Sequence, residues 1–231
     1  MTARLYAARG PAGTALLDLA SGRWKFLDPI AGDVFDRLAA GATAEAAIDE
    51  LTDRWAATGA DPAMVRASLT SVTVDLATLG VDSAVRRAQP ASAPVVRFAP
   101  GARPSLWARV AGGAGLVGAL LFLRVLPFRH VVALARAAGR LPGRPARVED
   151  AESLLVAVRA LGAWWPGRIA CLEESLAVHL AAALTGRPVR WVLGARFVPR
   201  GAHAWVVVDG HVIGQDEADR VWPYLPVLTA E

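Results

Sequence analysis

Cys171 is the only cysteine among the 231 residues of the chain, and its position favours a reactive thiol. It opens residues 171–184, in which leucines recur at helical spacing, while Pro166 and Gly167 prevent a helix from starting much earlier. A thiol in the first turn of a helix meets unpaired backbone N–H groups and the positive end of the helix dipole, which both favour the thiolate. The sequence therefore predicts a nucleophilic cysteine that needs a nearby base.

His203 is the candidate base, and the sequence around it predicts a β-hairpin. It lies in an expected strand, residues 202–208, that is followed by Asp209-Gly210, a strong signal for a two-residue turn, and by a return strand to about Asp216. If the hairpin closes on this dipeptide, His203 faces Asp216, with the two side chains about 5 Å apart. A carboxylate at that distance can orient an imidazole, so the register nominates Asp216 as the third member of the site.

Gln215 is the alternative to Asp216. It would face the opposite side of the hairpin, but a β-bulge would shift the pairing by one residue. A neutral amide can also orient a catalytic histidine, so both residues stay open as candidates.

Neither Cys171 nor His203 alone would indicate a catalytic site. An isolated cysteine is more often a small buried apolar residue than a nucleophile, and an isolated strand histidine is usually part of the core. The combination of a thiol at a helix start with a histidine and an acid on a later hairpin reverses this expectation. His179 lies two turns beyond Cys171 and is expected to stay outside the site.

No metal site, cofactor or disulfide is expected. One cysteine cannot form an internal disulfide, and no cysteines and histidines occur at zinc-site spacing.

The elements that hold the candidate site extend over residues 105–231. We expect helical, apolar sequence over residues 105–138 with an interruption at Pro127, a helix over about residues 150–163 and a strand over residues 190–194.

The most apolar segment, residues 110–123, has only 14 residues. A membrane-spanning helix needs about 20. We therefore expect a buried or interfacial helix and no stable membrane span. The first ten residues lack the apolar core of a signal peptide, so a cytoplasmic location is expected.

Residues 1–82 have their own organisation, in which three strands precede three helices. The first and third helices begin at Asp28-Pro29 and Asp61-Pro62, where an N-cap residue is followed by proline at the first helical position. The strands are expected over residues 3–7, 15–19 and 23–27.

Residues 83–104 contain prolines at positions 90, 94, 100 and 104, and are expected to form a linker without regular structure. The fold class is therefore α+β, with two domains joined by this linker.

The composition excludes some classes of protein. A hydrophobic content of 54% is ample for packed cores and argues against disorder. The net charge of +4 comes from scattered arginines, which indicates a solvated basic surface rather than nucleic-acid binding, although an acidic peptide could be attracted.

The C-terminal part resembles the transglutaminase-like, papain-like fold and, more narrowly, the lasso-peptide B proteins, which are leader peptidases. The resemblance rests on four short motifs in the same order: Cys171-Leu-Glu-Glu-Ser-Leu-Ala, Gly186-Arg-Pro-Val, Leu193-Gly-Ala-Arg and Ala202-His-Ala-Trp-Val. It implies a cysteine peptidase that cuts a ribosomally made precursor between leader and core. A partner cyclase then closes the core into a macrolactam. In that family the acid often occupies the position of Gln215.

Residues 1–82 resemble a pyrroloquinoline-quinone D-like, winged-helix-like peptide-recognition domain, through Leu16-Leu-Asp-Leu, Gly22-Arg-Trp and Asp28-Pro29. The resemblance implies that the leader adds as a strand along the third strand and packs against the third helix. The implied contact residues are Arg23, Trp24, Lys25, Arg66, Leu69 and Thr73.

Two other functions stay open. A leader-binding scaffold without catalysis would have an unreactive Cys171, and a transglutaminase-type acyl transferase would use the same residues with an amine as acceptor.

Overall fold

The computed structural model describes residues 4–78, 81, 85–87, 95–97, 104–214 and 224–230. The chain forms two compact units, one made of residues 1–89 with 197–200 and the other of residues 90–196 with 201–231. The division falls within the segment expected to be a linker.

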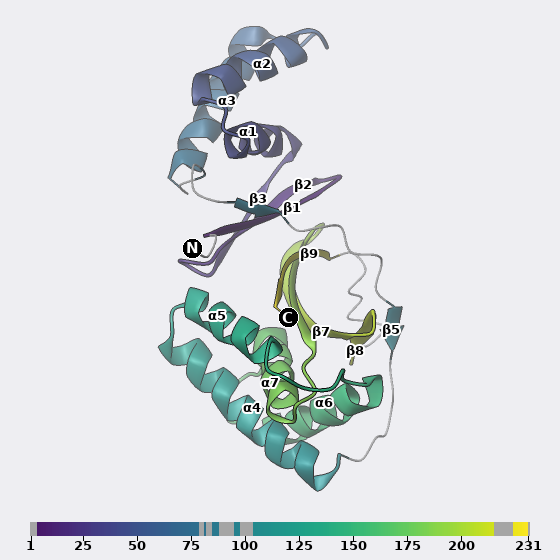
Figure 1. The fold of residues 1–231 in the computed structure, drawn as a ribbon. Coiled ribbons are helices and arrows are strands. Elements are labelled where there is room, and N and C mark those ends of the chain that lie inside the picture. Colours follow the sequence, from purple (N-terminus) through teal and green to yellow (C-terminus); the bar gives the residue numbers. More distant parts are fainter. Residues whose placement is uncertain are drawn as a thin grey trace. The chain divides into compact units, whose positions relative to one another are not determined.

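The first unit contains a four-stranded sheet and three helices, which lie between the third and fourth strands in the chain (Figure 1). The sheet has the order β3-β2-β1-β4, with antiparallel pairing among the first three strands and parallel pairing of β4 with β1. Its strands are β1 (Leu5–Gly10), β2 (Gly13–Asp18), β3 (Arg23–Leu27) and β4 (Val85–Arg87). The helices are α1 (Pro29–Ala39), α2 (Ala44–Ala56) and α3 (Pro62–Ala77).

Each helix of this unit begins at the cap residue that its sequence indicates. The side chain of Asp28 accepts a hydrogen bond from the backbone N–H of Ala31 at 2.8 Å, and Asp61 does the same for Ala63 at 2.9 Å. Thr43 caps α2 in the same way. The expected order of three strands and three helices is confirmed, whereas the winged-helix-like arrangement stays a prediction.

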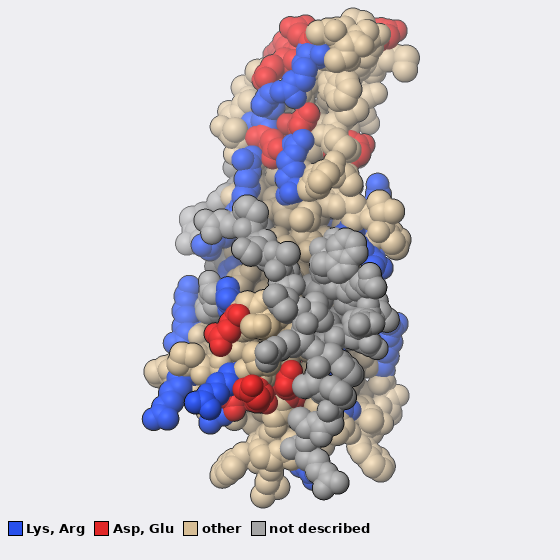
Figure 2. Space-filling view, turned by 90° about the vertical axis from the view of Figure 1, so that its right-hand side faces the viewer, with Lys and Arg blue, Asp and Glu red and all other residues tan. Residues whose placement is uncertain are grey.

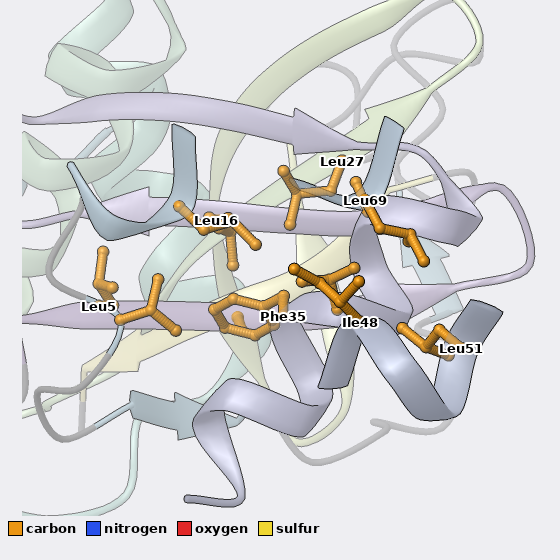
Figure 3. Close-up of a cluster of buried hydrophobic side chains, with 12 residues drawn as sticks. Leu5, Leu16, Leu27, Phe35, Ile48, Leu51 and Leu69 are labelled. Atoms are coloured by element: carbon orange, nitrogen blue, oxygen red, sulfur yellow. The ribbon is translucent and has the colours of Figure 1, made fainter. Parts of the chain in front are cut away.

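The core of the first unit lies between the sheet and its helices. Figure 3 shows Phe35 of α1 among Leu5, Leu16 and Leu27 from the strands, with Ile48 of α2 beside it. Phe35 is completely buried, so this aromatic ring joins α1 to the sheet.

Charged side chains on the first unit are largely paired with one another. Figure 2 shows basic and acidic side chains interleaved over its helical part. Arg9 contacts both Asp33 and Asp36, and Arg54 also contacts Asp33. Many arginine side chains of the first unit are therefore paired with carboxylates of the same unit.

The second unit packs helices against a five-stranded sheet with the order β5-β8-β7-β6-β9. Figure 1 shows α7 among the other three helices of this unit, and it packs against each of them. The helices are α4 (Leu106–Val125), α5 (Phe128–Gly139), α6 (Val148–Gly162) and α7 (Cys171–Leu184). The strands are β5 (Val95–Arg97), β6 (Arg190–Phe197), β7 (Arg200–Val208), β8 (His211–Ile213) and β9 (Leu225–Ala230).

The expectation that residues 83–104 contain no regular structure is wrong in two places. β4 pairs with β1 and β5 pairs with β8, both in parallel. These three-residue strands consist of valines and arginines and contain no proline, and pairing with partners distant in the sequence stabilises them.

Helix α4 lies between residue 105 and the interruption at Pro127, as the sequence predicts, and is longer than the apolar segment 110–123. It has 20 residues, because Ser105 caps its start by accepting a hydrogen bond from Ala108 and because Leu106 and Val125 extend it at the two ends. By length and composition alone this helix could cross a membrane, although 28% of its most apolar stretch is buried against the rest of the protein.

Glycine allows α4 to approach α7 closely. A β-carbon at Gly115 would lie only 2.3 Å from the backbone oxygen of Ala177, which leaves no room for any side chain. The helix that carries Cys171 is therefore held by backbone-to-backbone packing against α4.

Candidate functional site

Cys171 is the first residue of α7, as the sequence predicts. The preceding residue, Ala170, donates its backbone N–H to the Glu173 carboxylate at 3.0 Å, which fixes the start of the helix. Further along α7, Ser175 accepts a hydrogen bond of 2.9 Å from the indole N–H of the fully buried Trp191 in β6. The thiol is thus positioned by a capped helix end that is also tied to the sheet.

His203 lies on β7, and the hairpin that follows has the predicted register. Val208 pairs with His211 and Val207 with Val212. The turn residues Asp209 and Gly210 have φ values of 47° and 78°, as a type I′ turn requires. Local sequence was sufficient here because both turn residues tolerate the left-handed backbone conformation.

The structure brings Cys171 and His203 into contact. The thiol hydrogen-bonds with the His203 side chain and with the backbone N–H of Ala204. Burial acts to raise the pKa of the thiol, and so does the charge of Glu173. The two hydrogen bonds and the positive charge of His203 outweigh these effects, so the pKa of Cys171 lies below its ordinary value. The arrangement favours a thiolate beside an imidazolium.

Aromatic rings surround the imidazole of His203. Trp205 stacks against it with ring centroids 5.9 Å apart, and Tyr224 lies 5.2 Å away in a tilted orientation. Trp205 fits there because Gly194 of β6 has no side chain, since a β-carbon on Gly194 would lie 2.4 Å from the indole ring. The glycine of the Leu193-Gly-Ala-Arg motif therefore makes room for a ring that holds His203.

Arg159 of α6 connects the cysteine helix to the end of the hairpin. Its guanidinium makes two hydrogen bonds of 2.9 Å to the carboxylate of Glu174 and another of 2.9 Å to the backbone oxygen of Gly214. Gly214 has a φ of 73° and packs tightly on Leu155, so no other residue would fit at this position. These contacts fix the chain at the residue just before Gln215.

Both candidates for the third role, Asp216 and Gln215, lie outside the described residues. The confirmed register of β7 and β8 is the one from which Asp216 was nominated, so the choice between the two stays a prediction.

His179 contributes to the structure and does not join the thiol. Its ring is completely buried, and its two nitrogens lie 2.9 Å from the backbone oxygen of Val189 and 2.7 Å from that of Ala135, so the neutral ring donates a hydrogen bond to one of the two. Burial lowers its pKa, and the two carbonyls, which act in the opposite direction, offset this only in part. The expectation that His179 stays outside the site is consistent with these contacts.

Two of the four tryptophans near the site in sequence are exposed. Trp191 and Trp205 are buried, whereas Trp164 is 89% exposed and Trp165 is 46% exposed. Both exposed rings lie in the segment that leads to Cys171.

Among the described residues, no group of three or more histidine, cysteine, aspartate or glutamate side chains could hold a metal ion.

The residues expected to contact a leader are divided between the surface and the core of the first unit. Arg23 and Arg66 are exposed, and Trp24, Lys25 and Thr73 are half-buried. Leu69 is fully buried in the core, and the expectation that it contacts a leader stays a prediction. It lies on the face of α3 that packs on the sheet, and helical periodicity alone could have placed it there.

Sequence reasoning missed several residues that support the site. Tyr224 precedes β9, an edge strand that was not predicted because Pro226 interrupts its pattern. Arg159 was read only as part of a helix. No local signal distinguishes it, because its partners are 15 and 55 residues away in the sequence.

Comparison with known proteins supports the fold of the second unit. A family model described as the transglutaminase-like superfamily matches residues 114–229, which include Cys171 and His203. Searches of curated proteins and of solved structures gave no match. Since the matched segment covers half of the sequence, the chain belongs to the transglutaminase-like superfamily.

Proposed function

We propose that this chain is a cysteine peptidase that binds and removes the leader of a lasso-peptide precursor in the cytoplasm. The released core would pass to a partner cyclase that closes the macrolactam. The observation that carries this proposal is the hydrogen-bonded pair of Cys171 and His203, in which the pKa of the thiol is lowered. The short motifs shared with lasso-peptide B proteins supply the substrate class.

In the proposed reaction His203 takes the thiol proton, and the sulfur of Cys171 attacks the carbonyl carbon that joins leader to core. Backbone N–H groups at the start of α7 stabilise the oxyanion. The C–N bond then breaks, the proton passes from His203 to the core amine, and the leader remains as a thioester on the sulfur. Water hydrolyses this thioester and frees the leader carboxylate.

Leader binding is proposed for the edge of the sheet in the first unit. Among the described residues β3 pairs only with β2, so its outer edge can accept an added strand. Lys25 is the register partner of Leu16, which lies in the core, so both side chains are on the face that the helices cover. An added leader strand would meet Lys25 and Arg23 on that face, which favours acidic leader residues there.

The exposed Arg66 of α3 already pairs with Asp49 at 2.5 Å. A leader carboxylate would therefore have to compete for it. The half-buried Thr73 donates its hydroxyl to the backbone oxygen of Leu69 at 2.7 Å, so it offers a leader only its oxygen lone pairs. We accordingly assign the strand residues the larger share of specificity.

Mass spectrometry of a lasso-type precursor incubated with the protein tests this function. We expect two products, a leader with a free carboxylate and a core with a free amine, and no reaction with Cys171→Ala. Normal cleavage by Cys171→Ala would rule out the proposed nucleophile.

The same experiment with an added primary amine separates hydrolysis from acyl transfer. The superfamily includes the transglutaminase type, so this alternative is tested directly. Incorporation of the amine at the leader carboxyl terminus would replace the peptidase assignment by acyl transfer.

A further inference from the structure

Helix α4 turns six large apolar side chains toward solvent, whereas five of its six buried positions are alanine or glycine. The buried positions are Ala108, Ala111, Gly112, Gly115, Leu116 and Ala119. The exposed apolar side chains, which together we call the α4 face, are Leu106, Trp107, Val110, Val117, Leu121 and Val125. A helix that met only water would have the opposite arrangement, because burial of large apolar side chains is the more favourable choice. Something apolar therefore covers this face.

The α4 face follows the helix from end to end. Most of its members are spaced by three, four or seven residues, which is one or two helical turns, so they lie on one side of the helix along about 30 Å. Beside it opens a cavity of about 580 Å³, which is lined by Trp107 and Val110 of α4 and by Leu154 and Leu184 of the neighbouring helices. Asp150 also lines the cavity, and its charge is neutralised by Arg187. The apolar surface thus extends beyond the helix itself.

The charged residues of α4 itself are all basic. The sequence contains no aspartate or glutamate from residue 83 to residue 148, and this segment contains eleven arginines. Arg109 and Arg124 are exposed near the two ends of the stripe, about 22 Å apart along the helix. Arg129 and Arg140 of the adjoining α5 region are exposed as well. The covering surface should therefore be apolar and anionic.

A second copy of the chain does not meet this requirement. Two α4 faces packed together would bring arginines near arginines, with no acidic residue on either stripe to compensate. A membrane-spanning arrangement is also unsuitable, because the opposite side of α4 packs against α6 and α7 through Gly112 and Gly115.

We infer that the α4 face binds the surface of an anionic lipid bilayer, with α4 lying in the plane of the interface. An apolar stripe bordered by arginines is the pattern of helices that lie at the boundary between headgroups and acyl chains. Arginines in this position attract anionic lipids and extend their guanidinium groups to the phosphates. This site is separate from the proposed leader peptidase activity.

Vesicle flotation of the full-length protein tests the inference. We expect binding to vesicles of phosphatidylcholine with phosphatidylglycerol, weaker binding to phosphatidylcholine alone, and a decrease of the former with added salt. The double variant Val117→Ser/Leu121→Ser should lower the apparent affinity at least about tenfold. Arg109→Gln/Arg124→Gln should weaken binding and reduce its salt dependence.

Exposed apolar residues of the first unit provide a matched control. Met64 and Val74 are 71% and 62% exposed, compared with 64% for Val117 and 54% for Leu121. Met64→Ser/Val74→Ser should bind vesicles like the wild type. An equal loss of vesicle binding in the two double variants would overturn the inference. Wild-type binding that is equally strong to neutral and to anionic vesicles would overturn it as well.

A labelling experiment does not depend on the fold surviving the serine variants. In a Cys171→Ala background, an environment-sensitive dye on Val117→Cys should shift its emission to the blue with the anionic vesicles, and the same dye on Val74→Cys should not. Absence of the shift at Val117 would refute the lipid site. Sedimentation velocity without lipid identifies the competing explanation, since a dimer abolished by Val117→Ser/Leu121→Ser would make the α4 face a self-association surface.

Discussion

The contact between Cys171 and His203 predicts how the reactivity of the thiol depends on its neighbour. The His203→Ala variant removes a side-chain hydrogen bond and a positive charge from the thiolate, while the burial and the Glu173 charge that disfavour the thiolate remain. A hydrogen bond to a charged group is worth about 1.5–3 kcal/mol. Loss of this contact should therefore decrease the thiolate population about tenfold to a hundredfold at a pH below both pKa values.

The observable effect on alkylation is smaller than the change in thiolate population. A thiolate with a higher pKa is intrinsically more nucleophilic, with a Brønsted coefficient of about 0.4–0.5, so the rate should fall about three- to sixteenfold. The lower part of this range is expected, because Cys171 is only partly buried and solvent screens the interaction.

The assay is the rate of iodoacetamide alkylation as a function of pH, followed by mass spectrometry. Wild type should reach half-maximal rate below the pH of an ordinary thiol, and His203→Ala should do so at higher pH. Glu173→Gln provides a control of opposite sign, because it removes a charge that raises the pKa of the thiol but keeps an oxygen for the Ala170 N–H. Identical pH profiles for wild type and His203→Ala would refute the assigned contact.

Three further variants test the supporting residues. Gly194→Ala should displace Trp205 and lower kcat for leader removal at least about tenfold, with little loss of leader affinity in a binding assay; wild-type kcat would count against the role of the ring stack. Arg159→Gln should lower kcat in the same assay by releasing the end of β8 from α7, and Arg159→Lys, which cannot make the bidentate contact with Glu174, should restore it only in part. Full activity of Arg159→Gln would exclude this positioning role. Because burial lowers the pKa of His179 in the folded state, protonation favours the unfolded state, so wild-type stability should fall as pH drops below about 6.5, by at most about 1.4 kcal/mol per pH unit from this group. His179→Gln should show a shallower fall in denaturant titrations at several pH values, and an equal slope would contradict the assignment.

The parts of the structure that local sequence determines could be predicted. Asp28 and Asp61 start helices because their side chains accept from the next turn, and Asp209-Gly210 sets the register of the hairpin through its own backbone preferences. The position of Cys171 at a helix start could also be predicted from local sequence, because Pro166 and Gly167 precede an uninterrupted helical pattern.

The parts that depend on distant partners could not be predicted. The strands β4 and β5 exist because they pair with β1 and β8, and nothing in three residues of sequence indicates this pairing. Arg159 and Tyr224 acquire their roles only when α6 and the strands come together. The burial of Leu69 likewise depends on which side of α3 meets the sheet.

The exposure of the α4 side chains could not be predicted from the sequence either. An apolar helix with glycine and alanine among larger residues can bury either side, and α4 buries the small one because Gly112 and Gly115 permit close contact with its neighbours. The α4 face is therefore a property of the packing and not of the composition.

The intact mass of the protein after acid quenching of a reaction with a lasso-type precursor tests the role of Cys171 most directly. We expect a transient covalent adduct with the mass of the leader acyl group, located on Cys171 by peptide mapping, while free core appears in solution. Cleavage that proceeds without any adduct, and that continues in Cys171→Ala, would contradict this role.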